Sequence, residues 1–152
     1  MEAVELIFGT YPSWSHLVVR VILGVIFFGH GAQKVFGWFG GPGLKGTIAA
    51  FGRMNIPAPA ATFAALVECF GGLALIPGFV TRPAALGLAV VMLVAILKVH
   101  GRHGLFLNMS MTPGKGHGFE FNLALIAMAL SLLIGGGGAL SIDRLISPLG
   151  VG

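Results

Sequence analysis

Ionisable side chains interrupt the long apolar runs of this 152-residue sequence. His30 and Lys34 lie in the first run, Glu68 lies in the second, and Lys98 and His100 end the third. Ionisable groups inside an apolar segment are costly to bury, so they are expected to turn inward and find partners. Histidine and carboxylate side chains can exchange protons, and lysine can stabilise negative charge on a ligand. We therefore predict that His30 and Glu68 are catalytic, with Lys34 beside them as a ligand-binding residue.

Three further residues at a similar depth are candidates for ligand binding. Lys98 and His100 lie near the end of the third apolar run, and Glu120 lies at the start of the fourth. The structural alternative is that Lys98 extends to the membrane surface and that His100 and Glu120 are ordinary interface residues. For Glu68, the corresponding alternative is that the carboxylate only neutralises Lys34.

Two charged residues fall near the opposite ends of the same runs. Arg20 lies near the start of the first run, and Asp143 follows the fourth. Because few other partners exist for either charge, we expect a structural ion pair that holds the first and last helices together. Thr81, followed by Pro83, is predicted to cap the N-terminus of the third helix.

The sequence gives little support for a metal site. Histidine and carboxylate side chains suit zinc or non-haem iron, and two histidines on separate helices could ligate haem. However, no HxxxH or ExxH spacing occurs on one helix, and the single cysteine, Cys69, can form neither an intramolecular disulfide nor a CxxC pair. We therefore assign no metal ligands and expect neither a metal nor haem.

Composition decides what must surround these residues. The chain is 56% hydrophobic and only 9% charged, with a mean hydropathy of +0.95, whereas about a quarter of the residues in a soluble domain are charged. A water-soluble domain needs a polar surface that this chain cannot supply, so a lipid bilayer must surround it. The net charge of +4 is spread along the sequence without a basic cluster, which argues against nucleic-acid binding.

Four apolar runs are close to the length of about 20 residues that a membrane-spanning helix needs. We predict an all-α fold in which residues 1–152 form a single membrane domain, an integral four-helix bundle with up-down-up-down topology. The predicted spans cover residues 17–36, 59–79, 83–100 and 119–140.

The connections follow from this topology, because consecutive spans reverse direction. The Gly-rich loops 37–58 and 101–118 are expected on one membrane face, with the termini on the other. Small residues beside Glu68, among them Gly71 and Gly72, would let a neighbouring helix come close to the carboxylate. All the candidate residues except the ion pair lie toward the two loops or just below, so the bundle is expected to gather them in one polar pocket near that face.

Six short motifs follow one another along the chain: Arg20-x-x-x-Gly24, His30-Gly31-x-x-Lys34, Glu68-x-x-Gly71-Gly72, Gly78-x-x-Thr81-Arg82, Glu120-Phe121-Asn122 and Ser141-Ile142-Asp143. The order of these motifs, from about residue 17 to 145, resembles the DoxX family of small four-helix membrane proteins. The resemblance implies a multi-pass protein of the bacterial inner membrane that is tied to redox metabolism. Relatives are described as quinone-linked, including a thiosulfate:quinone oxidoreductase subunit, as parts of membrane oxidoreductase complexes with soluble partners, or as quinone and thiol stress proteins.

Carried over residue by residue, the resemblance points to the same pocket. It would contain His30, Lys34, Glu68 and Glu120, and the Glu120-Phe121-Asn122 motif adds Asn122 to the ligand-binding candidates. The single cysteine departs from members that need a cysteine pair for thiol exchange. More distant relatives with four helices act as receptor-assembly chaperones in animals, so this fold does not fix the function.

Two functions are open at this point. The first is a component of a quinone-linked oxidoreductase, in which the pocket binds a quinone-like molecule as cofactor or substrate. The second is a non-enzymatic membrane scaffold or assembly factor that recruits soluble redox enzymes through its loops. Transport is a weaker third hypothesis, because broken helices and inverted repeats are not evident. A homo-oligomer is compatible with each of them.

Overall fold

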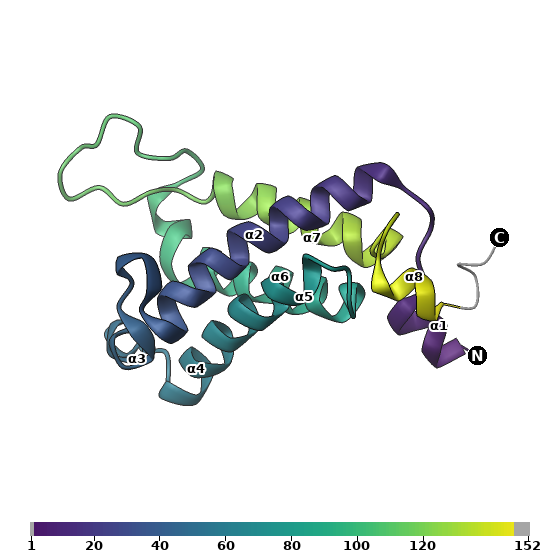
Figure 1. Cartoon of the computed structure of the whole chain (residues 1–152). Coiled ribbons are helices and arrows are strands. Elements are labelled where there is room, and N and C mark those ends of the chain that lie inside the picture. Colours follow the sequence, from purple (N-terminus) through teal and green to yellow (C-terminus); the bar gives the residue numbers. More distant parts are fainter. Residues whose placement is uncertain (1, 148–152) are drawn as a thin grey trace.

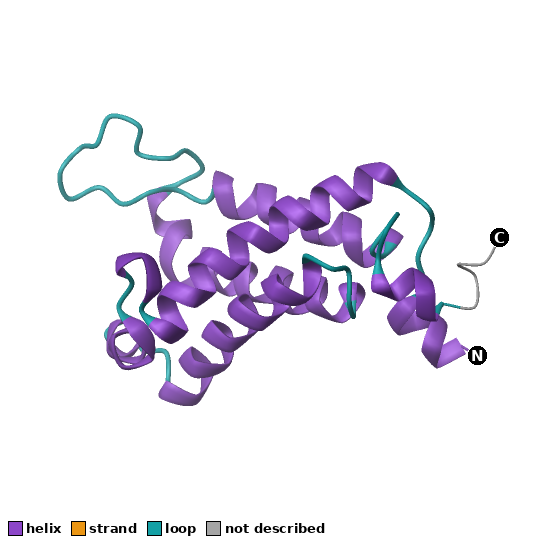
Figure 2. Ribbon diagram, in the orientation of Figure 1, coloured by secondary structure: helices purple, strands orange, loops and turns teal. Residues whose placement is uncertain are grey.

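The structure, a computed structural model, describes residues 2–147 (Figures 1 and 2). Within this range the chain is helical without any β-strand, which agrees with the predicted all-α class. The symbols η1 and η4 denote short 3₁₀ turns, and η2 and η3 denote π-helical turns. The elements are α1 (Glu2–Phe8), α2 (Trp14–Phe36), η1 (Trp38–Gly40), α3 (Gly43–Gly52), α4 (Ala58–Leu66), η2 (Val67–Gly71), α5 (Gly72–Leu75), α6 (Thr81–Ala95), η3 (Ile96–His100), η4 (Gly101–His103), α7 (Glu120–Gly135) and α8 (Ile142–Ile146).

Three helical stretches are long and apolar enough to cross a membrane. They correspond to the first three predicted spans and cover Trp14–Phe36, Ala58–Leu75 and Thr81–His103. The first begins at Trp14 rather than at residue 17, because the Ser13 hydroxyl accepts a hydrogen bond from the His16 N–H and caps the first turn. It ends at Gly37, whose φ of +74° is a conformation that favours glycine.

The fourth predicted span is shorter than expected. In place of residues 119–140, α7 covers Glu120–Gly135, which is 16 residues and therefore about 24 Å long at 1.5 Å per residue. The helix ends in the glycine run, where Gly136 and Gly138 have φ values of +75° and +74°. A hydrocarbon core is about 30 Å thick, so α7 is short for a crossing without local thinning of the bilayer. The four-span topology therefore stays a prediction.

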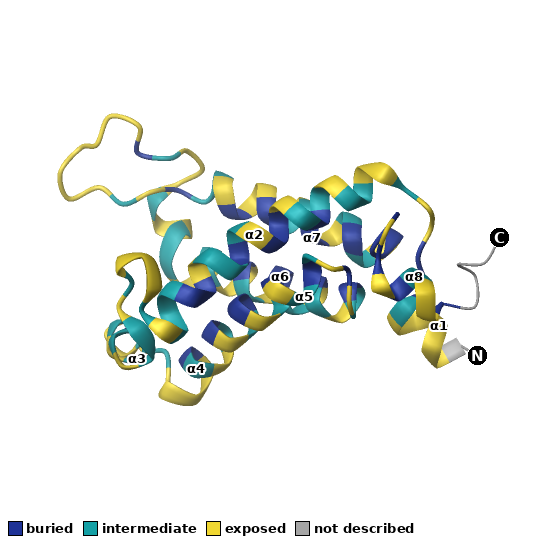
Figure 3. Ribbon diagram, in the orientation of Figure 1, coloured by how far each residue is buried: buried dark blue, intermediate teal, exposed yellow. Residues whose placement is uncertain are grey.

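α2 packs closely against the second spanning stretch. A β-carbon on Gly31 would lie 2.2 Å from the backbone nitrogen of Cys69, and one on Gly72 would lie 2.4 Å from the backbone nitrogen of Phe28. Neither distance is compatible with a side chain, so this contact requires glycine. Figure 3 shows the buried positions on the facing sides of the helices. The core between α2, α5, α6 and α7 contains Leu23, Phe27, Leu75, Leu88, Leu125 and Leu132.

Two of the spanning stretches widen into a π-helical turn. In the second stretch η2 carries Glu68, and in the third η3 carries Lys98 and His100. Backbone hydrogen bonds in such turns run from residue i to residue i+5, and π turns occur frequently at functional sites. The angular spacing of 100° per residue does not hold across them, so the direction of these three side chains could not be read from helix periodicity.

The connection predicted as a loop at 37–58 contains a helix. α3 packs against α2 and α4, and the Thr47 hydroxyl donates a hydrogen bond of 3.1 Å to the carbonyl oxygen of Lys34. Figure 1 shows α3 and the irregular segment 104–119 at one end of the bundle, whereas α1 and α8 lie at the other. We call these the α3 end and the α1 end.

Arg20 and Asp143 attract each other electrostatically, but within the described chain they do not form the direct salt bridge that a structural ion pair implies. Arg20 is 1% exposed. Its guanidinium donates instead to the backbone carbonyls of Leu75, Ile76, Gly137, Ala139 and Leu140. A guanidinium has five N–H donors, so these carbonyls occupy all of them. They belong to the end of α5 and to the segment after α7, where helix termini leave carbonyl groups unpaired. Arg20 thereby joins α2 to both of these helix ends.

Asp143 uses its carboxylate oxygens to cap α6. Its two carboxylate oxygens accept hydrogen bonds from the Val80 N–H at 2.7 Å and from the Thr81 N–H at 2.8 Å. A carboxylate at this position also complements the dipole of the helix. The Thr81 hydroxyl, which was predicted to be the cap, is buried and has no hydrogen-bond partner in the described structure.

We expect Arg20→Lys to destabilise the protein although the substitution keeps the charge. An ammonium group has three donors, so at least two buried carbonyls would lose their partners, at about 1–3 kcal/mol each. Thermal unfolding of the purified protein in detergent should therefore show a lower Tm than wild type. Arg144→Lys at the same end is the matched control, because the Arg144 guanidinium makes no hydrogen bond to another described residue. An equal loss of Tm in both variants would contradict the structural role of Arg20.

Candidate functional site

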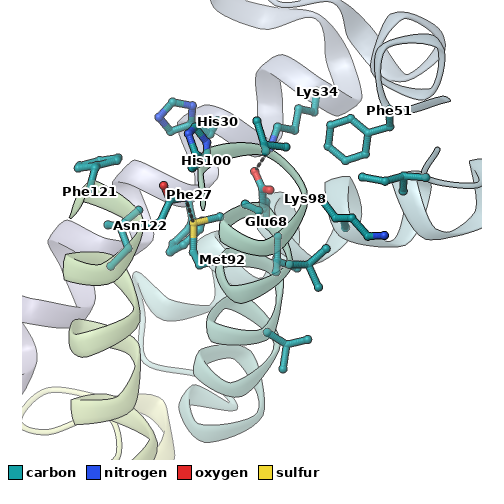
Figure 4. A pocket seen from close by; sticks show the side chains of 18 of the residues that line it. Phe27, His30, Lys34, Phe51, Glu68, Met92, Lys98, His100, Phe121 and Asn122 are labelled. Atoms are coloured by element: carbon teal, nitrogen blue, oxygen red, sulfur yellow. Dashed lines mark hydrogen bonds and ion pairs between the residues drawn. The ribbon is translucent and has the colours of Figure 1, made fainter. Parts of the chain in front are cut away.

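The α3 end of the bundle contains a cleft of about 790 Å³. Its walls come from α2, α3, α4, η2, α6, η3, α7 and the segment 104–119 (Figure 4). A cavity of this size is typical of small-molecule sites. Most of the lining residues are apolar, and the ionisable ones are His30, Lys34, Glu68, Lys98, His100 and His117.

Lys34 and Glu68 form an ion pair in this cleft, as Figure 4 shows. Lys34 Nζ lies 2.5 Å from Glu68 Oε2, and the two side chains are 25% and 3% exposed. The ammonium also lies 5.9 Å from the centre of the Phe51 ring, which is within range of a cation–π contact. The pair neutralises both charges, as the structural alternative for Glu68 requires. It also leaves Glu68 Oε1 without a hydrogen bond from the described chain, so this oxygen is available to a ligand.

Six of the predicted site residues line the cleft: His30, Lys34, Glu68, Lys98, His100 and Asn122. His30 from α2 and Lys98 from η3 are exposed, and neither makes a hydrogen bond or ion pair to another residue in the described range. Asn122 is buried, and its side-chain amide lies 3.4 Å from the sulfur of Met92 on α6 (Figure 4). The structure therefore gathers these side chains, while their parts in binding or catalysis stay predictions.

Two imidazoles on the loop side of the cleft are held by backbone groups. His100 Nδ1 lies 3.0 Å from the carbonyl oxygen of His117, and His117 Nδ1 lies 3.2 Å from the Asn108 N–H, which donates to it. In the neutral forms, His100 therefore carries its proton on Nδ1 and His117 on Nε2. The Nε2 atom of His100 is left as an acceptor and that of His117 as a donor. Among the described residues, no three His, Cys, Asp or Glu side chains form a group that could hold a metal ion.

Glu120 has a different position from the one predicted. It is not part of the cleft lining, and its carboxylate accepts a hydrogen bond of 2.8 Å from the Leu107 N–H. Its own N–H donates to the carbonyl of Leu105, also at 2.8 Å. Glu120 thus fastens the segment 104–119 to the start of α7, and we describe it as a residue that positions this segment rather than as a ligand contact.

Sequence analysis missed the residues that the two connections contribute. Phe51 and Ile56 come from α3 and the turn that follows it, and Leu107 and His117 come from the segment 104–119. Part of the signal was present, because Thr47 and Phe51 are four residues apart and share a face if residues 43–52 are helical. The segment 104–119 has no such period, so nothing in its sequence indicated which side chains face the cleft.

Comparison with known families shows to which protein family the chain belongs. The sequence model of the DoxX family matches residues 15–101. This range includes all of α2 except its first residue, the helices α3, α4, α5 and α6, and five of the six ionisable cleft residues. The chain belongs to the DoxX family. This DoxX protein is a multi-pass membrane protein, in agreement with its three apolar helices.

Named relatives of this DoxX protein include two membrane proteins. "Inner membrane protein YqjF" of Escherichia coli (strain K12) is 32% identical over 86% of this chain and 91% of its own length. "Uncharacterized membrane protein Rv3486" of Mycobacterium tuberculosis is 32% identical over 90% of both chains. A third relative, "Putative oxidoreductase CatD" of Bacillus subtilis (strain 168), is 30% identical over 86% of this chain and 85% of its own length. No solved structure matches the chain.

We expect the Lys34–Glu68 pair to stabilise the protein as a unit. Lys34→Met leaves a buried carboxylate without its partner, which typically costs about 3–5 kcal/mol and less here because Lys34 is 25% exposed. Glu68→Leu should also lower the Tm in detergent, whereas the double variant Lys34→Met/Glu68→Leu should recover most of the loss. Lys45→Met, at an exposed position on α3, serves as the control. Losses that simply add in the double variant would show that the two residues are not coupled.

Proposed function

We propose that this DoxX protein is the membrane component of a redox system and that its cleft binds a quinone-like molecule. The observation that carries the proposal is an apolar cleft of about 790 Å³ in which ionisable groups converge from α2, η2, η3 and the segment 104–119. A quinone supplies a flat apolar ring that accepts two electrons, with two oxygens that accept hydrogen bonds and protons. Apolar walls with a few placed polar groups fit such a molecule.

Each ionisable residue has a role in this proposal. Glu68, through its free Oε1, and His30, which has no partner in the described chain, exchange protons with the ligand oxygens. Lys34 holds the Glu68 carboxylate in place, and Lys34 and Lys98 stabilise negative charge that develops on the ligand. His100 can contribute a further acceptor at Nε2.

The proposal of redox chemistry is supported by the relatives. The name of CatD describes that protein as an oxidoreductase, and it is 30% identical to this chain over most of both lengths. Reduction of a quinone requires an electron donor, and we propose that a soluble redox enzyme supplies the electrons at the α3 end.

The proposal places α7 as a fourth crossing of the bacterial cell membrane, with α3 and the segment 104–119 on one face. Residues 1–152 then act as one membrane domain.

A second candidate function is a scaffold or assembly factor without catalysis. It is favoured by the segment 104–119, which exposes the apolar side chains of Phe106, Met109 and Met111 at the α3 end. Exposed apolar side chains on a projecting segment suit contact with another protein. Under this alternative, the ion pair in the cleft would only stabilise the bundle.

Titration with a quinone analogue tests the first proposal. The purified protein in detergent should bind decylbenzoquinone, and Glu68→Gln and His30→Ala should each weaken binding by about ten-fold or more. This is the effect expected when a hydrogen bond to a charged or titrating group is lost, at about 1.5–3 kcal/mol. Glu5→Gln makes the same chemical change on the exposed part of α1 and should leave the affinity unchanged.

Unchanged affinity in both cleft variants would remove the quinone proposal. If those variants also had a lower Tm but still captured the same soluble proteins as wild type, the scaffold function would be favoured instead. Measuring affinity and Tm on the same preparations separates the two outcomes.

A further inference from the structure

We infer that the cleft is loaded from within the bilayer, through an opening between α4 and α6, and that its ligand is a membrane-dissolved quinone with an apolar tail. This inference rests on the proposed function of the cleft and adds the route of entry and the class of ligand. It is drawn from the packing of the helices around the cleft, from the exposure of its rim and from the hydrogen bonds that close its other sides.

α4 and α6 border the cleft without the extensive packing that joins other neighbouring helices of the bundle. On this side of the bundle α6 packs against η2 and α5, where a β-carbon on Gly87 would lie 3.1 Å from Val67 Cγ1. Nearer the α3 end, Ala60 and Ala64 of α4 and Val91 of α6 line the cleft instead. The alanines are too short to bridge the space to α6, so an opening is left between the two helices.

The rim of this opening is apolar and lies at the depth of the acyl chains. It contains Phe63 from α4 and Val90 and Val94 from α6, which are 68%, 50% and 42% exposed. Val90 is nine residues into the spanning stretch Thr81–His103, which places it about 14 Å from the start of that helix at 1.5 Å per residue. A rim at this depth faces hydrocarbon, because the hydrocarbon core is about 30 Å thick.

The loop side of the cleft is covered by a hydrogen-bonded segment. The segment 104–119 contributes Leu107, His117 and Gly118 to the cleft lining. It is fastened by the Leu107 N–H to the Glu120 carboxylate at 2.8 Å, by the Gly118 N–H to the Phe106 carbonyl at 3.1 Å and by His100 to the His117 carbonyl at 3.0 Å. A ligand from water would have to break these contacts to enter there.

The side between α2 and α7 is closed by core packing. Phe27 of α2 and Leu125 of α7 line the cleft there, and both are buried members of the hydrophobic core. The two helices also pack extensively against each other, which α4 and α6 do not. Phe121 of α7 is also an exposed apolar lining residue, at 45%. The opening between α4 and α6 differs in that exposed apolar residues from both bordering helices lead into the cleft.

The charges of the cleft orient the ligand. Lys34 and Glu68 neutralise each other, which leaves Lys98 as an uncompensated positive charge one helical turn, about 6 Å, beyond Val94. A ring with oxygen acceptors fits beside Glu68 and Lys98, and a tail attached to that ring can leave past Phe63 and Val94 into the bilayer. A tail-bearing quinone meets both requirements, whereas a tailless water-soluble ring has no need of this opening.

Photo-crosslinking tests the route directly. The full-length protein in phosphatidylcholine vesicles is labelled with a benzoquinone that carries a diazirine at the end of a ten-carbon tail, with decylbenzoquinone as competitor, and the labelled peptides are mapped by mass spectrometry. We expect labelling that the competitor suppresses at Phe63, Val90 and Val94. Suppressible labelling confined to the segment 104–119 or to α2 and α7 would overturn the inference while leaving the proposed quinone binding intact. No suppressible labelling anywhere would overturn both.

A second variant tests the opening without the photoprobe. Ala60 lies exposed on the rim, so Ala60→Trp should obstruct entry while being accommodated by the fold. The rate constant for its association with decylbenzoquinone in vesicles should fall by about ten-fold or more. Mutations commonly change association rate constants by about ten- to a thousand-fold. Leu86→Trp, on the exposed face of α6 and outside the cleft lining, should associate like wild type. Wild-type association by Ala60→Trp, at an unchanged Tm, would overturn the inference.

Discussion

The contact between α2 and the second spanning stretch determines where the other functional parts of this DoxX protein lie. Gly31 meets the backbone at Cys69 and Gly72 meets the backbone at Phe28, so the two helices approach more closely than any side chain would allow. Glu68 precedes Cys69, and Lys34 follows Gly31 by one helical turn, so the contact itself brings the carboxylate and the ammonium together. Larger residues at either glycine would separate them and leave the buried Glu68 carboxylate without a partner.

The two ends of the bundle deal with buried charge in different ways, and the chemistry of arginine and lysine explains the difference. At the α1 end, helices stop and leave carbonyl groups inside the protein, and the planar fork of Arg20 satisfies five of them at once. Broken backbone at membrane depth is tolerated when it is paired in this manner inside the protein. At the α3 end, Lys34 instead makes a point contact with Glu68, which leaves one carboxylate oxygen free.

Composition and hydrophobic runs were sufficient to predict the helical class, the membrane location and the first three spans, because lipid imposes strong constraints on length and polarity. They also gave the pairing of Lys34 with Glu68 as one alternative, since a buried charge must find a partner, whereas His30 lines the same cleft without a partner in the described chain. Two features could not be read from the sequence. The first is the set of hydrogen-bond partners of Arg20. Its guanidinium donates to backbone carbonyl groups, and because every residue has one, the sequence does not indicate which carbonyls are bound. Lys98 and His100 lie on a π turn, where helical periodicity fails, and α3 lies in a stretch too short to stand out from its glycines.

The distribution of polar contacts also explains why the α3 end has room for a cleft. At the α1 end, Arg20 joins α2 to the ends of α5 and α7, and Asp143 joins the start of α6 to the segment after α7. All the spanning helices are thus fixed to one another there. At the α3 end, the ion pair joins α2 only to the second stretch, and Glu120 joins α7 only to the segment 104–119. Neither contact draws α4 toward α6, and this arrangement accounts for the opening that we propose between them.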